Sequence, residues 1–283
     1  FGNAYQHLPS PRTATFRISG SSSGQLKAVT SNYTLSFWLN MSTGSGLHPN
    51  NWTSSKNTIW LETSTTGSVT NNLKCREVQI DSSGQLKLTE FYDDGGSNKD
   101  RSWNWSGFYS AHSGTMKNLI IKHDSNPSNL PTAFVNGVEL SAPTPSGFSA
   151  TSPVLKHSDD ALFLLGDNNF GGTTDFTGVV DDFSMWNVQL SSTEIEELYS
   201  NGLVYDLRGH SRYANVVAWF DFEDPAGNDR IVDTFTSNIT LRQPPSPASN
   251  CVQITSPLPA TRAARRFNLT TPVGAAYNAT VTV

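Results

Sequence analysis

Residues 178–187, GVVDDFSMWN, carry the clearest fold signal in this chain. The run Val179–Trp186 is rich in β-branched and aromatic side chains, which favours a strand. A helical pattern follows over Ser191–Asn201, with Ser191 as N-cap, Glu194 three residues later to complete a capping box, and Gly202 as the stop. The block therefore predicts a strand that leads into one short helix.

Outward from this block, apolar and polar residues alternate with a period of two, as in half-buried strands. In Asn32–Met41 the odd-numbered positions from Tyr33 to Met41 share one face. The Asn136-Gly137 pair between two valines predicts a tight type I′ hairpin. Further strand-like runs occur at Thr13–Ile18, Thr58–Leu61, Glu77–Ile80, Leu86–Phe91, Met116–Lys122, Thr132–Val135, Ala161–Leu165 and Val216–Phe222. Short strands separated by Gly, Ser, Asn and Asp clusters predict a sandwich or barrel.

Several of these segments, taken in order, resemble the laminin-G-like, concanavalin A-like jelly rolls. They are Tyr33–Leu39, Ala133–Val138, Leu162–Gly166, Gly178–Asn187, the helical Leu190–Tyr199 and the aromatic-acidic Ala218–Glu223. The resemblance covers roughly Thr13 to Leu241. It implies an all-β fold, a two-sheet antiparallel concanavalin A-like jelly-roll sandwich with one short helix. Because this superfamily includes lectins, adhesion domains, hydrolases and structural modules, the resemblance leaves the function open.

The expected domain organisation is one jelly-roll domain over residues 1–241, followed by a C-terminal arm over residues 242–283. The arm is expected because prolines cluster between Arg242 and Arg266, and proline interrupts strand pairing. The last stretch, Phe267–Val283, resumes β-like alternation and predicts a terminal β segment.

Charge and composition restrict the partners. Asp and Glu outnumber Lys and Arg by 24 to 19, which gives a net charge of −5. A nucleic-acid partner is not expected, since no basic stripe is available to neutralise phosphates. Membrane insertion is not expected either, because no apolar run approaches the roughly 20 residues that span a bilayer. Charged residues make up 15% of the chain, against roughly 25% in an average domain, which is typical of exported or virion β-proteins.

The two cysteines, Cys75 and Cys251, are too few for a disulfide scaffold and too far apart for a redox or zinc motif. One disulfide between them is predicted, because exported proteins tend to oxidise their thiols. Two buried thiols are the open alternative.

Calcium is the expected metal, since jelly rolls of this class often hold it in loops and it prefers carboxylate and carbonyl oxygens. The best loop contains Asp167, Asn168 and Asn169, with Asp175 beyond it. A second candidate is the segment Glu90–Gly96, with Asp93 and Asp94. Each loop is more simply interpreted as a Gly/Asn/Asp turn.

Aromatic side chains supply the candidate ligand site. Four tryptophans lie within strand patterns and are expected in the core, namely Trp38, Trp60, Trp186 and Trp219. Trp52, Trp103, Trp105 and Tyr109 lie in stretches rich in Ser, Asn and Gly, so we expect them to be partly exposed and to form a platform on which sugar rings stack. A packing role for these rings is the alternative.

Catalytic motifs are weak. Asp221 and Glu223 alternate onto one face, but Pro225 occupies the position where a glucanase strand would supply a third carboxylate. Ser22 matches a nucleophile pattern without the required strand-to-helix context. The sequence therefore predicts a non-catalytic recognition module, extracellular or on a virion surface, that binds a glycan or cell-surface receptor. The alternatives are a structural domain that contacts other virion or surface-protein subunits, and a glycan hydrolase or lyase.

Overall fold

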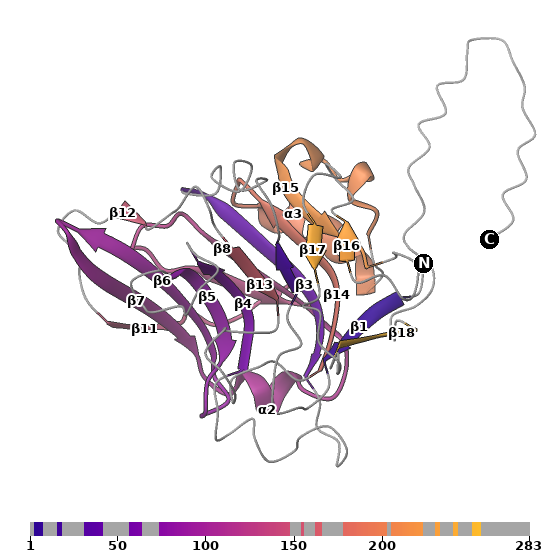
Figure 1. Cartoon of the computed structure of the whole chain (residues 1–283), viewed down its shortest axis with the longest axis horizontal. Coiled ribbons are helices and arrows are strands. Elements are labelled where there is room, and N and C mark those ends of the chain that lie inside the picture. The colour runs from indigo at the N-terminus through magenta and orange to yellow at the C-terminus, as the bar shows by residue number, and fades with distance from the viewer. Residues whose placement is uncertain are drawn as a thin grey trace, which may run out of the picture.

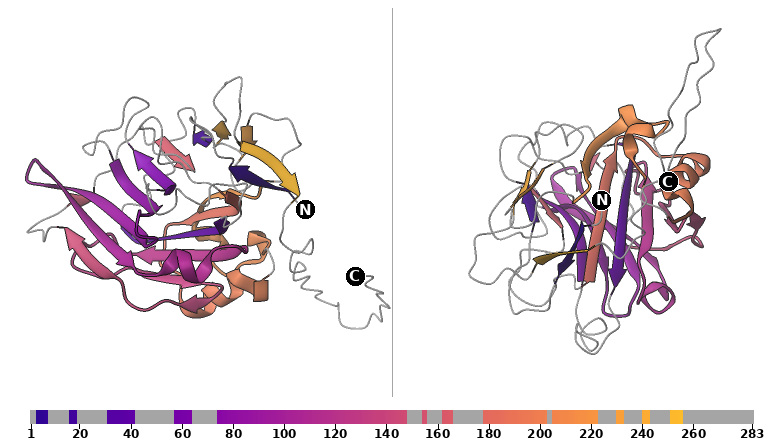
Figure 2. Two further views of the ribbon diagram at one scale, coloured as in Figure 1. Left: turned by 90° about the horizontal axis from the view of Figure 1, so that it is seen from below. Right: turned by 90° about the vertical axis from the view of Figure 1, so that its right-hand side faces the viewer.

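The computed structural model of the chain contains two antiparallel β-sheets, called sheet A and sheet B below (Figure 1). It describes residues 3–7, 16–18, 31–41, 57–63, 74–147, 154–155, 162–165, 178–202, 205–222, 230–232, 240–242 and 251–255. Figure 2 shows the two sheets as separate layers, as expected for a sandwich.

Within the described residues, sheet A has the strand order β10-β9-β8-β3-β14-β1-β18, and β15 pairs with β14. Its strands are β1 (Asn3–His7), β3 (Tyr33–Met41), β8 (Lys117–His123), β9 (Thr132–Val135), β10 (Val138–Glu139), β14 (Gly178–Trp186), β15 (Val216–Phe220) and β18 (Cys251–Thr255). β3 and β14 are 137 or more residues apart in sequence yet adjacent in space, as jelly-roll topology requires.

Sheet B has the order β11-β7-β6-β5-β4-β13-β2-β17-β16, and β12 pairs with β6. Its described strands are β2 (Phe16–Ile18), β4 (Asn57–Thr63), β5 (Lys74–Ile80), β6 (Leu86–Asp94), β7 (Ser97–Trp105), β11 (Thr144–Gly147), β12 (Val154–Leu155), β13 (Leu162–Leu165), β16 (Arg230–Val232) and β17 (Thr240–Arg242). The described helical segments are α2 (Phe108–His112), α3 (Ser192–Tyr199), η2 (Ser200–Gly202), η3 (Leu207–Gly209) and η4 (Tyr213–Asn215).

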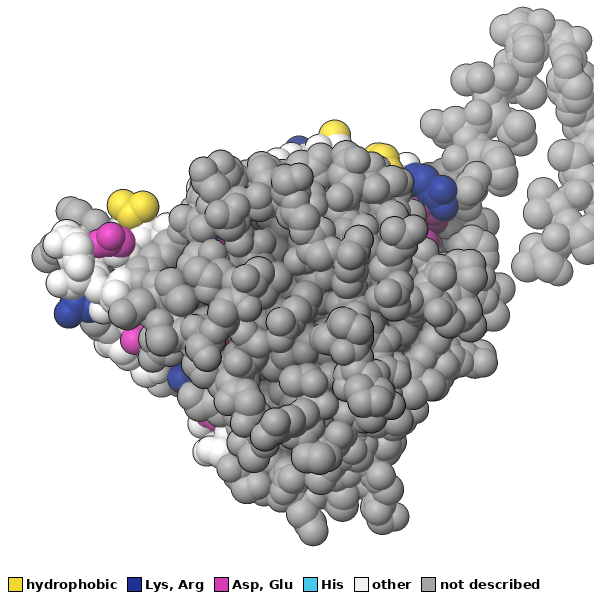
Figure 3. Space-filling view, in the orientation of Figure 1, with side chains coloured by type: hydrophobic (Ala, Val, Ile, Leu, Met, Phe, Trp, Pro, Cys, Tyr) yellow, Lys and Arg dark blue, Asp and Glu magenta, His cyan; other side chains and the backbone are white. Residues whose placement is uncertain are grey.

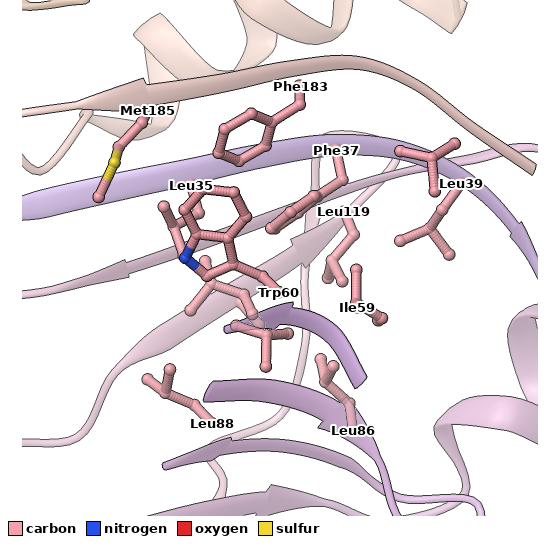
Figure 4. Close-up of a cluster of buried hydrophobic side chains, with 14 of the residues drawn as sticks. Leu35, Phe37, Leu39, Ile59, Trp60, Leu86, Leu88, Leu119, Phe183 and Met185 are labelled. Atoms are coloured by element: carbon pink, nitrogen blue, oxygen red, sulfur yellow. The ribbon is translucent and has the colours of Figure 1, made fainter. Parts of the chain in front are cut away.

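The main core lies between the inner faces of the two sheets (Figure 4). Leu35 and Phe37 from β3 meet Trp60 from β4 and Phe183 from β14. The rings of Trp60 and Phe183 stack with centroids 4.5 Å apart. Offset aromatic contacts of this kind fix the spacing of the two sheets in addition to burying apolar area.

The outer face of sheet A is covered by α3. Ile195 and Leu198 of the helix pack on Trp186 and Trp219 in a second apolar cluster. The predicted capping box is present, because Ser191 Oγ accepts from the Glu194 N–H while the Glu194 carboxylate accepts from the Ser191 N–H. β3 is therefore buried on both faces, not on one face as its alternation predicted.

Three local expectations can be compared with the structure. The Asn136-Gly137 hairpin is confirmed, with φ of 52° and 75° at the two turn residues. Residues 97–105 form the strand β7, which the sequence did not predict. β18 lies in the expected arm but pairs with β1, so sheet A extends past Leu241.

Candidate ligand-binding face

The outer face of sheet B is polar over β5, β6, β7 and β11. The inward positions of β6 are taken by core residues such as Leu86 and Leu88, so alternation turns Lys87 and Thr89 outward. Two cross-strand rows result from the register of the strands. The first row is Thr58, Gln79, Lys87, Asn104 and Thr144, and the second is Glu77, Thr89, Ser102 and Ser146. We call these nine residues the polar face.

Hydrogen bonds connect neighbouring members of the polar face. Thr58 Oγ1 donates to Glu77 Oε1 at 3.1 Å, and the hydroxyls of Thr89 and Ser102 lie 2.9 Å apart. Asn104 Nδ2 donates to Ser146 Oγ at 3.1 Å. Such side-chain pairs hold their polar atoms in fixed positions, which lowers the entropic cost of ordering them around a ligand.

Exposure increases across the polar face from β4 to β11. Lys87 and Asn104 are half-buried, Thr144 and Ser146 are exposed, and the remaining five members are buried, namely Thr58, Gln79, Glu77, Thr89 and Ser102. The side-chain oxygen of Gln79 is buried and has no hydrogen-bond partner among the residues that the structure describes. In Figure 3, basic, acidic and other polar side chains are visible at the end of the molecule where β6 and β7 lie.

The polar face has little net charge. Glu77 is its one carboxylate and Lys87 its one cation. Hydroxyl and amide groups, which both donate and accept, provide the remaining seven side chains. This set suits a neutral, hydroxyl-rich ligand better than a phosphate or sulfate.

The predicted aromatic platform is wrong for Trp103 and Trp105. Both belong to β7, and both point inward into the core, with exposed fractions of 0% and 4%. Tyr109 is half-buried against the same core, and burial raises the pKa of its phenol. Trp52 lies outside the described residues. Trp103 and Trp105 do project on one side of an extended segment, as expected, but that side faces the core.

The predicted calcium ligands Asp167, Asn168, Asn169 and Asp175 lie outside the described residues. At the second candidate loop, Asp93 Oδ1 accepts from the Gly96 N–H at 2.6 Å, which is a turn interaction of the β6–β7 hairpin. Within the described part of the chain, no group of three or more His, Cys, Asp or Glu side chains is arranged to hold a metal ion.

The two cysteines lie in different sheets. Cys75 is buried in β5 of sheet B, and Cys251 begins β18 of sheet A. The side chain of Cys251 is outside the described ones, so the disulfide stays a prediction.

The two carboxylates considered for catalysis lie near the end of β15. Asp221 is half-buried directly after this strand, and Glu223 lies beyond the described residues.

One buried polar cluster was missed at the level of sequence. Glu90 and His123 are both buried on inward positions of their strands. The sequence signal for this burial is the alternation of Leu86, Leu88 and Glu90, because a strand that turns its even positions inward must also bury Glu90.

Among the helices that the structure describes, none has the length and apolar character needed to cross a bilayer.

Among known proteins, a similar fold occurs in a solved structure of low sequence identity. No curated protein matches the sequence. A solved structure of a candidate carbohydrate-binding protein from Bacteroides ovatus is 15% identical with a TM-score of 0.50, over 91% of this chain and 61% of that one. The chain therefore spans about three fifths of that protein. A heptameric SAP-like pentraxin from Limulus polyphemus is 10% identical with a TM-score of 0.47, over 90% of this chain and 95% of that one.

The likeness to the Bacteroides ovatus structure concerns the fold alone. The family is shown by the sequence, since residues 17–196, well over half of the chain, match the laminin-G-like model of the concanavalin A-like lectin/glucanase superfamily. The strands and the helix that first suggested the resemblance include β3, β9, β14 and α3. The chain belongs to the concanavalin A-like lectin/glucanase superfamily.

Proposed function

We propose that this chain is a non-catalytic carbohydrate-binding module whose ligand lies at the exposed end of the polar face, over β7 and β11. The observation that carries the proposal is the pair of hydrogen-bonded polar rows that cross β5, β6, β7 and β11 on one face of a rigid sheet. Membership of a superfamily that contains lectins, and a fold shared with a candidate carbohydrate-binding protein, support it.

The chemistry of the polar face fits sugar hydroxyls. Asn104 and Ser146 each combine donor and acceptor capacity at the exposed end of the rows. The buried Gln79 oxygen lacks a donor in the described part of the chain. An unsatisfied buried acceptor costs about 1–3 kcal/mol, and a ligand or water hydroxyl that reaches it would recover part of that cost.

The absence of turnover is also part of the proposal. Glycoside hydrolysis uses two carboxyl groups, about 5–5.5 Å apart in retaining enzymes and about 6.5–9.5 Å apart in inverting ones. Glu77 is the one carboxylate in the polar rows, so the face supplies a single member of such a pair. We further propose that the module acts outside the cell or on a virion surface, as its low charge content suggests.

The test is binding of neutral oligosaccharides, first on a glycan array and then by calorimetry. Asn104→Ala should weaken binding about 5- to 10-fold, since one lost hydrogen bond is worth about 1 kcal/mol. Asn215→Ala is the matched control, because Asn215 donates to Asn187 Oδ1 beside β14 and β15 of sheet A, whereas the polar face belongs to sheet B. Equal affinities for the two variants would contradict the proposed face, and release of reducing ends by the wild-type protein would contradict the non-catalytic assignment. Symmetric oligomers that bind no glycan would favour a structural role.

A further inference from the structure

A cluster of ionisable side chains is buried between the sheets, at one end of the apolar core. Glu62, Arg76, Glu90 and His123 come from four different strands, and each is at most 1% exposed. Arg76 Nε lies 3.6 Å from Glu62 Oε2, and His123 Nδ1 lies 3.2 Å from Glu90 Oε2. Two acids and two bases thus balance one another where single charges would be very costly.

The geometry around His123 defines its charge state. Its Nδ1 faces the Glu90 carboxylate, while its Nε2 faces the Asn129 carbonyl oxygen at 3.3 Å and Asp124 Oδ1 at 3.5 Å. Every one of these partners is an acceptor. A neutral imidazole has one N–H, so only the protonated ring can donate in both directions.

The remaining partners of Glu90 donate to it. Tyr33 Oη donates to Glu90 Oε1 at 2.7 Å, and Tyr92 Oη donates to Glu90 Oε2. The guanidinium of Arg76 lies over the Tyr33 ring at 4.2 Å. Glu90 is therefore held as a carboxylate by two phenols and two cations, and it remains available as the counter-ion of His123.

Asn129 and Asp124 belong to the loop between β8 and β9, residues 124–131. Asp124 organises this loop, because its Oδ1 accepts from the Asn126 N–H at 2.9 Å and its Oδ2 accepts from Asn129 Nδ2 at 2.5 Å. The Asn129 N–H also donates to the Asn126 carbonyl oxygen at 3.0 Å. His123 thus connects a loop with its own internal bonds to a carboxylate in the core.

We propose that His123 is a pH-sensitive latch that fastens the β8–β9 loop to the sandwich core while it is protonated and releases the loop when it loses its proton. Loss of the proton leaves a lone pair on one ring nitrogen. If Nδ1 keeps its hydrogen for Glu90, Nε2 faces two oxygens without a donor, and the contact with the loop becomes repulsive.

The ionisation equilibria have the sign that the latch requires. Burial alone would lower the pKa of His123, but the charge and hydrogen bond of Glu90, with Asp124 and the Asn129 carbonyl, raise it above its ordinary value. Burial would raise the pKa of Glu90, but His123, Arg76 and Tyr92 lower it. The stabilisation from His123 is therefore fully present below about pH 6.5 and is lost as the pH rises through the raised pKa.

Among the residues that the structure describes near the ring, none competes for this role in the neutral range. Burial raises the pKa of both Tyr33 and Tyr92, which keeps the phenols protonated. Burial lowers the pKa of Arg76, but Glu62 and its neighbours raise it above its ordinary value, so the guanidinium stays charged. Trp103 packs edge-on against the ring at 4.7 Å without ionising. On β7, Arg101 pairs in register with Glu90 and directs Nη1 to the Gly147 carbonyl.

The first experiment uses the wild-type protein. The imidazole nitrogens of His123 are titrated by NMR. Hydrogen exchange of the hydrogen-bonded loop amides of Asn126, Ser128 and Asn129 is followed over the same pH range, as protection factors corrected for intrinsic exchange. We expect a pKa above 6.5 and a fall in loop protection with the same midpoint, about tenfold for each pH unit above it. A pKa at or below 6.5, or loop protection that does not follow the titration, would overturn the latch.

The second experiment compares His123→Gln with His112→Gln. Glutamine cannot change its charge, so the pH-dependent step in loop protection should disappear in His123→Gln. His112 lies in α2 and has its pKa lowered by burial and by Lys117, so its substitution should leave the step unchanged. Persistence of the step in His123→Gln would contradict the proposal, and the wild-type titration decides the question if that variant fails to fold.

Discussion

The direction of a side chain depends on the strand that carries it, and Trp103 and Trp105 illustrate this at the scale of single residues. Both rings sit among Ser, Asn and Asp, which made their segment resemble an exposed loop. In the structure the segment pairs with β6 along nine residues, so each ring is forced to one face or the other. Both rings point from β7 into the core.

Truncation of Trp103 should therefore reduce stability. Trp103→Ala should lower the free energy of unfolding by about 3–5 kcal/mol, the cost of removing a large buried ring. Urea unfolding measures this loss. Leu130→Ala, at a residue that is 49% exposed, is the control and should cost less than about 1 kcal/mol. A small loss in Trp103→Ala would mean that the ring is not packed as described.

Asp182 combines an unusual backbone with a buried hydrogen bond. Its φ is 46°, inside a register shift of β14, and its Oδ1 accepts from Trp219 Nε1 at 2.8 Å. Asp182→Ala should cost about 2–4 kcal/mol, because the indole N–H loses its acceptor and alanine disfavours positive φ. Asp182→Asn keeps an acceptor and tolerates this backbone, so its thermal unfolding should stay near that of wild type. Equal losses in both variants would contradict this explanation.

At the scale of elements, local signals were sufficient wherever a strand or turn is specified by its own residues. The β9–β10 hairpin follows from Asn136-Gly137, and the start of α3 follows from its capping box. β7 could not be predicted in this way, because its residues 97–102 are all polar and its pairing with β6 and β11 supplies the stability. The burial of Glu90 is likewise not specified by its own segment, because its partners come from several strands.

The β9–β10 turn offers a test in which strain and contact can be separated. Gly137→Ala places a methyl group 3.0 Å from Tyr199 Cδ1 at a φ of 75°, whereas Gly96→Ala places it in open space at a φ of 85°. Both variants should lose about 1 kcal/mol or more from backbone strain. Gly137→Ala should lose more, because Tyr199 must also move. Identical melting temperatures for the two variants would show that the contact with the helix is unimportant.

At the scale of the whole molecule, the alternation of many short segments predicted the sandwich, and the family match covers most of it. Which face of each strand is buried depends on contacts with the second sheet and with α3. A local sequence pattern does not contain these contacts. Sequence patterns alone therefore predict an aromatic ligand platform, whereas in the structure Trp103 and Trp105 lie in the core.

Calcium binding remains a prediction for the loop with Asp167, Asn168, Asn169 and Asp175. If it occurs, calcium at a hundred times its dissociation constant should stabilise the protein by about 2.7 kcal/mol. Differential scanning calorimetry with calcium and with EDTA measures the effect. Asp167→Asn should abolish the difference, and Asp93→Asn, in the β6–β7 turn, should not. If EDTA leaves the melting temperature of the wild-type protein unchanged, the prediction of calcium binding is wrong.

The pairing of β1 with β18 has a consequence for how this fold can be connected. Asn3 and Thr255 are direct partners in an antiparallel pair, so their Cα atoms lie about 5 Å apart. A polypeptide entering at β1 and leaving after β18 arrives and departs at the same point. Such a unit can be spliced into a surface turn of a host protein as a side branch, without separating the two halves of its host.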